Sequence, residues 1–186
     1  VFAPVVNPDG HERFGKNQRP NQRGPAETGW RTTAQNLNLN RDYAKADAPE
    51  MRALIALLSE WDPIVYADLH VTDGAMFEHD MAVLVEPRDG YDPSLRAEGK
   101  AISDALLARL AEEGHLPLDF YPAFVEDGNP ESGFARGVAP IRFGNDYWAA
   151  RNRFGILLET HSWRPYGHRV KTTADFLRAL LGLAAA

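Results

Sequence analysis

Short apolar segments that alternate with helical patterns constrain the fold of this chain more than any other sequence feature. The strand-like segments are residues 64–70, 81–87 and 154–161. Apolar residues at helical spacing fill residues 47–61, 94–113 and 173–185. Fully apolar strands that alternate with helices are typical of a sheet buried between helix layers. We therefore predict an α/β fold with a mixed, mostly parallel central sheet flanked by helices.

The first helical segment has well-marked boundaries. Asp47 is placed as its N-cap, Pro49 as its first residue and Glu50 as the acid of a capping box. Asp62 and Pro63 then predict its end, because proline cannot continue a helix.

The segments outside this pattern predict loops and a few short elements. Residues 1–6 predict a buried strand, which the NPDG sequence at 7–10 would end in a tight turn. Residues 11–39 lack an apolar period and predict a long loop, which in a compact domain is usually either functional or disordered. Residues 117–142, rich in proline and glycine, predict an irregular excursion with one short strand, and residues 145–153 a short helix.

Composition narrows the class of protein. With 186 residues, 44% of them hydrophobic, the chain is long enough for one domain with a sizeable core. Its net charge of -6 argues against general nucleic-acid binding, and no apolar run reaches the ~20 residues that cross a bilayer. The absence of cysteine excludes thiol catalysis and cysteine-ligated zinc. Residues 11–41, however, hold six basic residues against two acidic ones, which predicts a local anion-binding surface.

Two of the predicted strands end on titratable side chains. The segment VYADLH ends on Asp68 and His70, and GILLETH ends on Glu159 and His161. Ligands of open α/β sheets bind beyond the carboxyl ends of the strands. We therefore expect an imidazole and a carboxylate at one rim of the sheet.

The order of these motifs resembles the zinc carboxypeptidases of the carboxypeptidase A/B type and their bacterial relatives. The motifs are NPDG, Trp30-Arg31, Asn40-Arg41, the helix APEMRAL, the strand ending in His70 and the strand ending in Glu159. The resemblance covers nearly the whole chain. It implies a zinc-exopeptidase-like α/β/α sandwich. Because Val1 opens directly on an apolar segment, we expect residues 1–186 to be one catalytic-domain portion that lacks its N-terminal segment.

The resemblance also implies roles for particular residues. His70 would bind the single zinc ion, and Glu159 would take a proton from a zinc-activated water. Arg31 would stabilise the oxyanion, since a guanidinium is a permanent, fork-shaped cation. Asn40 and Arg41 would hold the C-terminal carboxylate of a peptide, with arginine as a bidentate donor. The ordinary alternatives are a strand-end histidine bonded to Asp68 or Asp73, a solvated loop arginine and loop asparagines bonded to their own backbone.

The sequence departs from the family at three points. The family's other zinc ligands come from a His-x-x-Glu motif before NPDG, which this chain lacks. Either these ligands lie upstream of Val1 or the site is inactive, and the abrupt start at Val1 favours the first alternative. Asn38 stands where the family has an acid that orients a zinc-binding histidine, and Asp68 is a candidate replacement. The expected place of the substrate-capping tyrosine holds Phe134, which leaves Tyr121 and Tyr147 as substitutes.

The residues that would select the substrate side chain lie around residues 144–148, where the sequence pattern predicts little. Asp146 and Tyr147 fall near the region that lines the family's side-chain pocket, where an acid would favour basic C-terminal residues. A helix N-cap is an equally good interpretation of Asp146. The remaining histidines are predicted to be structural or on the surface: His161 structural, and His79, His115 and His168 on the surface.

The leading hypothesis is a zinc metallocarboxypeptidase that hydrolyses C-terminal residues of peptides. Two alternatives stay open: a zinc-dependent acyl-amino-acid deacylase of related fold, and a non-catalytic module that binds peptide C-termini. Arg31 and Glu159 favour catalysis, because binding alone requires neither an oxyanion stabiliser nor a base. The expected partner is a peptide, without nucleic acid or a membrane span, and family habit favours an exported protein.

Overall fold

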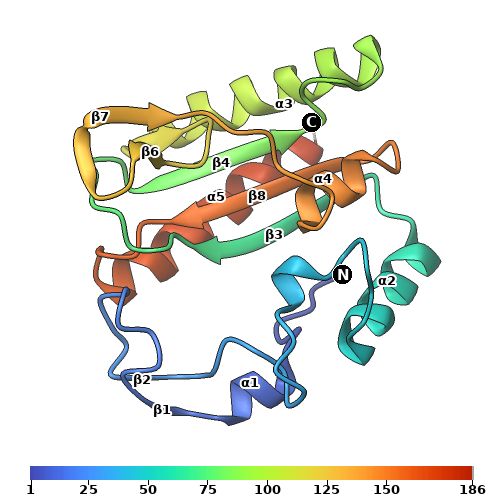
Figure 1. The fold of residues 1–186 in the computed structure, drawn as a ribbon. Coiled ribbons are helices and arrows are strands. Elements are labelled where there is room, and N and C mark those ends of the chain that lie inside the picture. The colour runs from blue at the N-terminus through green and yellow to red at the C-terminus, as the bar shows by residue number, and fades with distance from the viewer. Residues whose placement is uncertain (186) are drawn as a thin grey trace.

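The computed structural model, which describes residues 1–185, has a four-stranded mixed sheet at its centre (Figure 1). The strand order is β3 (Val65–Val71), β8 (Phe154–Thr160), β4 (Met81–Glu86) and β5 (Pro117–Leu118). Parallel pairing joins β3 to β8 and β4 to β5, and antiparallel pairing joins β4 to β8. The predicted α/β class with a mixed sheet is confirmed.

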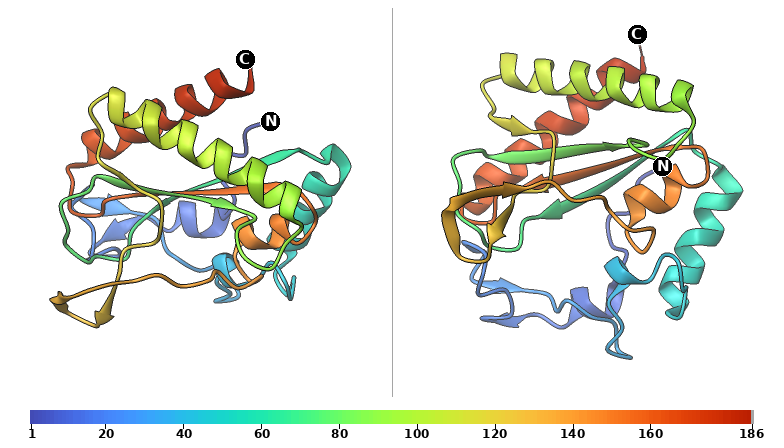
Figure 2. Two further views of the ribbon diagram at one scale, coloured as in Figure 1. Left: turned by 90° about the horizontal axis from the view of Figure 1, so that it is seen from above. Right: turned by 45° about the horizontal axis from the view of Figure 1, so that its top comes forward.

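Helices α3 (Pro93–Glu112) and α5 (Tyr166–Ala184) cover one face of this sheet (Figures 1 and 2). Because side chains alternate along a strand, this face receives every second residue of β4 and β8. The main core lies here, and its fully buried members are Met81, Val83, Val85, Leu106, Leu110, Ile156, Leu158, Phe176 and Ala179. The opposite face is therefore the one on which the polar residues of β3 and β8 lie.

Helix α5 begins earlier than residue 173, where the apolar pattern predicted it. It starts at Tyr166, directly after its N-cap residue Pro165. Its first two turns bury the polar residues Arg169 and Thr172, so these turns show no apolar period. The prediction of its start was wrong for this reason.

A second core packs under the N-terminal third of the chain. The 3₁₀ helix η1 (Leu39–Arg41) and helix α2 (Pro49–Trp61) contribute the buried residues Leu39, Tyr43, Ala48, Met51 and Leu54. The predicted helix is confirmed, but its N-cap residue is Ala48 and not Asp47. The buried Asp42 carboxylate accepts from the backbone N–H groups of Asp47 and Ala48, at 3.1 and 2.8 Å, and so replaces the expected cap.

The predicted strand at residues 1–6 is absent. These residues are exposed, and within residues 1–185 no strand pairs with them. An apolar run becomes a strand only where a neighbour supplies backbone hydrogen bonds. NPDG likewise forms no strand-ending turn: it starts helix α1 (Pro8–Glu12), in which the Asn7 side chain accepts from Gly10 N–H at 3.0 Å.

The remaining elements are small hairpins and one short helix. Strands β1 (Gly15–Lys16) and β2 (Glu27–Thr28) are the only strands that the structure describes in the loop at 11–39. The excursion at 117–142 contains the hairpin β6 (Ala123–Glu126) and β7 (Asn129–Ala135), where one strand was expected. Phe124 and Phe134 stack across this hairpin at 5.6 Å, a pairing that sequence periodicity does not reveal.

Helix α4 (Gly144–Ala149) packs on the polar face of the sheet, close to β8 and β3. Within residues 1–185, no helix is long and apolar enough to span a membrane.

Candidate functional site

His70 and Glu159 lie side by side at the carboxyl ends of two neighbouring strands. In the parallel pair β3–β8, His70 is in register with Glu159, and Glu159 is also in register with Ala82 of β4. Residues in register on adjacent strands have neighbouring side chains on the same face. The structure thus brings the predicted imidazole and carboxylate together on the face opposite α3 and α5.

A chain of polar contacts fixes the His70 ring. Its Nε2 lies 2.9 Å from Asp68 Oδ1, Asp68 is hydrogen-bonded to Tyr66, and the hydroxyl groups of Tyr66 and Tyr43 are 2.6 Å apart. Burial lowers the pKa of His70, but the charge and hydrogen bond of Asp68 outweigh it and raise the pKa to about 9. Because Nε2 faces Asp68, Nδ1 is the ring nitrogen left to bind a metal ion. A carboxylate behind a histidine is the usual support of a metal ligand.

Glu159 is almost fully buried, with 6% of its surface exposed. Its Oε2 atom has no hydrogen-bond partner in residues 1–185. Burial is the main cause that raises the pKa of Glu159 to about 7, and it outweighs the lowering by His70 and Arg31. A carboxyl group that titrates near neutrality is suited to accepting and returning a proton.

The charge of Arg31 acts on both His70 and Glu159, Arg41 lies near Glu159, and Arg142 lies beside Arg41. The Arg41 and Arg142 guanidinium carbons are 4.6 and 5.1 Å from the centre of the Phe143 ring. Burial, then the charges of Arg31 and Arg142, lower the pKa of Arg41, while Glu159 raises it. Arg31 and Arg41, both predicted, thus share the site with Arg142, which sequence reasoning missed. Arg142 and Phe143 adjoin the proline- and glycine-rich stretch, where no pattern pointed to them.

Asn38 and Asn40, which precede Arg41, make different hydrogen bonds. The Asn38 side chain accepts from Asn40 N–H at 3.2 Å and so caps η1, which is the ordinary role of a loop asparagine. Asn40 is half-buried, and its carbonyl oxygen accepts from Arg41 Nη1 at 2.7 Å. Asn38 therefore orients the Asn40–Arg41 pair.

Asp146 and Tyr147 follow one another in α4 but have different contacts. Asp146 accepts from the Tyr91 hydroxyl at 2.9 Å, and burial raises its pKa. It lines a cavity of about 150 Å³ together with Leu84, Glu86, Arg88, Tyr91, Phe120 and Arg136. Tyr147 packs on Tyr43 and Trp148, with ring centres 5.7 and 5.6 Å apart, in the second core.

Tyr121 is the tyrosine that lies near the catalytic candidates. Its hydroxyl oxygen accepts from Asp73 N–H at 3.3 Å. Burial, together with the charges of Glu159 and Asp73, raises the pKa of Tyr121. Of the two tyrosines that could replace the capping tyrosine, Tyr121 is thus the one whose pKa the charge of Glu159 raises.

Residues 1–185 contain no group of three or more His, Asp or Glu side chains arranged to hold a metal ion. His70 fits one position of a zinc site, since its ring is held by a carboxylate and Nδ1 is left to bind.

The loop at residues 72–80, which precedes β4, is hydrogen-bonded at both ends to the residues that follow Glu159. At its start, Thr72 N–H donates to Thr160 O at 3.0 Å; at its end, His161 N–H donates to Asp80 O at 3.0 Å. The His161 ring lies 2.9 Å from Phe77 O and also accepts from Trp163 N–H. His161 bonds to the backbone in this way, as predicted for a structural histidine.

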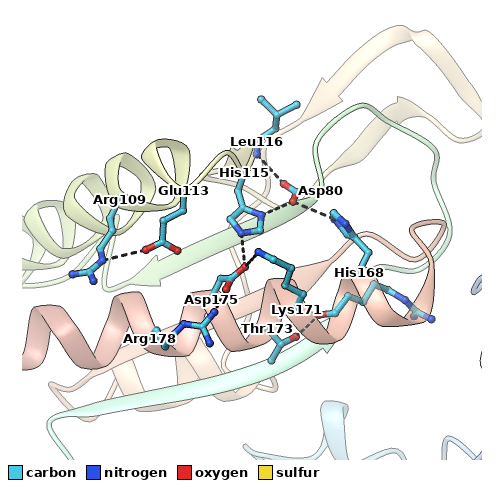
Figure 3. A network of polar contacts seen from close by, with 11 residues as sticks. Asp80, Arg109, Glu113, His115, Leu116, His168, Lys171, Thr173, Asp175 and Arg178 are labelled. Carbon is cyan, nitrogen blue, oxygen red and sulfur yellow. Dashed lines mark hydrogen bonds and ion pairs between the residues drawn. The ribbon is translucent and has the colours of Figure 1, made fainter.

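His115 was predicted on the surface, and this prediction was wrong. It is 7% exposed and lies between two carboxylates, with Nδ1 2.7 Å from Asp80 and Nε2 3.0 Å from Asp175 (Figure 3). His168 also approaches Asp80, at 3.4 Å. The network joins the end of α3 to α5 and to the loop before β4, so it holds that loop in place.

A family model for zinc carboxypeptidases matches residues 1–123 of this chain. The solved structures that resemble the chain include a metallo-carboxypeptidase from Pseudomonas aeruginosa in complex with (2-guanidinoethylmercapto)succinic acid. That structure has a TM-score of 0.61 and 17% identity, over 98% of this chain and 45% of the other. A metallo-carboxypeptidase from Burkholderia cenocepacia has a TM-score of 0.63 and 17% identity, over 96% and 43%. The chain thus spans less than half the length of these proteins, and their similarity supports the fold. No curated protein sequence matches the chain.

Proposed function

The chain belongs to the zinc carboxypeptidase family, and from this membership we propose that it removes C-terminal residues from peptides by hydrolysis. The observation that carries the proposal is the register of His70 with Glu159 across β3 and β8. It gives a carboxyl group with a pKa of about 7 beside a histidine whose ring a carboxylate holds.

Glu159 would act as the base that takes a proton from the attacking water and returns it to the leaving amine. Its unpartnered Oε2 atom supports this role, because a proton acceptor must be free to bind the water. Arg31, whose charge acts on both His70 and Glu159, would stabilise the negative oxygen that develops on the scissile carbonyl. Tyr121 would take the place of the missing capping tyrosine.

Asn40 and Arg41 would bind the α-carboxylate of the substrate. Arg41 is supported by the Phe143 ring, and Asn40 is set by the cap from Asn38. A guanidinium held in this way loses little conformational freedom when it pairs with a carboxylate. Recognition of a free carboxylate makes the proposed activity that of an exopeptidase.

The family is zinc-dependent, and His70 would supply one ligand to a single zinc ion. The other ligands of the family's set would precede Val1. When bound, zinc supplies a Lewis acid that lowers the pKa of water and polarises a carbonyl group.

Zinc content and peptidase activity test the proposal together. Zinc is measured by elemental analysis on this chain and on a form extended upstream, and hydrolysis of hippuryl peptides on the extended form. We expect one zinc in the extended form and a loss of activity of at least about 100-fold in Glu159→Gln, the scale of a missing general base. Glu50→Gln is the matched control, since Glu50 Oε2 is also buried without a hydrogen-bond partner but lies in α2. Full activity of Glu159→Gln, or no zinc in either form, would overturn the catalytic role. Acetylated amino acids as better substrates would favour the deacylase.

A further inference from the structure

Arg142 has no role in the function proposed above, although it lies beside Arg41. Arg31, Arg41 and Arg142 are called the arginine group below. The Arg142 guanidinium carbon is 5.1 Å from the centre of the Phe143 ring, which Arg41 approaches to 4.6 Å. The two cations are therefore neighbours that share one aromatic support. Such contacts stabilise a guanidinium without neutralising it.

None of these cations forms an ion pair with a carboxylate within the described chain. The ion pairs of its arginines involve Arg88, Arg109, Arg136, Arg153 and Arg178. Arg31, Arg41 and Arg142 form none. Burial is the main cause that lowers the pKa of Arg41, and the charges of Arg31 and Arg142 lower it further. An anionic ligand relieves this repulsion between like charges.

The nearby cavity does not offer a comparable excess of charge. Of its three acids, Glu86 lies 3.7 Å from Arg88 and Asp146 accepts from Tyr91, while Asp89 forms no ion pair within the described residues. Arg136, on its wall, lies 3.4 Å from Asp119. The cavity therefore carries no positive excess of its own, unlike the arginine group, which forms no ion pair in the part of the chain that the structure describes.

The Phe143 support is itself fixed by the backbone. Phe143 N–H donates to Pro140 O, and Tyr147 N–H donates to Phe143 O, both at 3.0 Å. Helix α4, which follows directly, is pressed onto β8 at Gly155. Both guanidinium groups thus rest on a ring that the fold positions before any ligand binds.

We propose that Arg142 binds a second carboxylate, the side chain of an acidic C-terminal residue, while Asn40 and Arg41 hold the α-carboxylate. The inference rests on the proposed function and adds its substrate class: peptides that end in glutamate or aspartate. Two guanidinium groups beside the same ring can each pair with one of the two carboxylates of a terminal glutamate. Since the protein carries a net charge of -6, long-range attraction does not explain a preference for a more anionic peptide.

Calorimetric titration tests this inference without catalysis. The peptides are acetyl-Ala-Ala-Glu, its isosteric partner acetyl-Ala-Ala-Gln, and both with amidated C-termini. A chelator in the buffer prevents hydrolysis. We expect the glutamate peptide to bind about tenfold more tightly than the glutamine peptide, the scale of one charge-assisted hydrogen bond. Arg142→Gln removes this difference and leaves the affinity for the glutamine peptide unchanged.

Arg151→Gln is the matched control, because Arg151 also lies over aromatic rings, those of Tyr147 and Trp148, but outside the arginine group. It should keep the preference. Equal affinity for the two free-acid peptides, or a preference that survives Arg142→Gln, overturns the inference while the proposed function stands. If amidated peptides bind as well as free acids, α-carboxylate recognition fails, and the proposed function fails with it.

Discussion

Gly155 in β8 lies so close to Asn145 in α4 that a Cβ atom on Gly155 would overlap the Asn145 carbonyl group. This contact places α4, and with it Phe143, on the polar face of the sheet. The position of the arginine group thus depends on a glycine in a strand whose other residues are mostly apolar.

Gly155→Ala is therefore expected to destabilise the protein by about 3 kcal/mol, the upper range for an added methyl group in a packed site. Neither backbone can move away easily, because Gly155 is hydrogen-bonded between β3 and β4. Urea denaturation measures the change. Gly167→Ala is the control, since a Cβ atom there meets nothing and alanine favours the helix; it should change stability by less than about 1 kcal/mol. Equal effects of the two substitutions would contradict the close contact.

The His115 network predicts a loss of stability in acid. Burial tends to raise the pKa of Asp80 and of Asp175, but hydrogen bonds from His115 and their other partners outweigh it and hold both below the usual range. A carboxylate with a lowered pKa in the folded state stabilises the fold at pH values above its unfolded pKa. This contribution disappears as the pH falls below about 4, the ordinary value for aspartate. Unfolding free energies measured from pH 7 down to pH 2 should show this decline.

His115→Gln tests whether the network causes that decline. The variant should lose about 2 kcal/mol at pH 7, because two buried carboxylates share fewer donors, and its loss between pH 5 and 2 should be smaller than in the parent chain. Glu113→Gln is the control on the same helix end. It removes only a partly exposed pair with Arg109 and should cost less than about 1 kcal/mol at either pH. If the unfolding free energy of His115→Gln declined between pH 5 and 2 as much as that of the parent chain, other carboxylates would cause the decline.

The contrast between His70 and His115 shows what local sequence can predict. His70 ends an apolar run, and strand alternation places it on the same face as Asp68, so its rim position is readable from a few residues. His115 follows a glycine at a helix end and looks like a solvated residue. Its burial depends on Asp80 and Asp175, which are 35 and 60 residues away. The same distinction explains why Arg142 was missed: it joins Arg41 only through the packing of α4.

Asn38 offers a test of how the substrate pair is held. Asn38→Ala removes the cap on η1 and should weaken binding of a peptide with a free C-terminus by several-fold, on the scale of about 1 kcal/mol for a lost cap. Asn38→Asp should retain binding, because an aspartate accepts from Asn40 N–H equally well. Calorimetry with acetyl-Ala-Ala-Glu measures both variants. If alanine binds like the parent chain, the cap does not position Asn40.

Phe143 provides the last test, because both guanidinium groups rest on its ring. Phe143→Leu keeps an apolar side chain but removes the aromatic face, so Arg41 and Arg142 lose their common support. We expect a fall of about five- to thirtyfold in affinity for acetyl-Ala-Ala-Glu, because an exposed cation–π contact contributes ~0.5–1 kcal/mol at each of the two arginines. Phe143→Tyr retains the face and should bind like the parent chain. The glutamine peptide, which engages Arg41 alone, should lose less affinity in Phe143→Leu than the glutamate peptide. Equal losses for the two peptides would mean that the ring supports Arg41 and contributes nothing through Arg142.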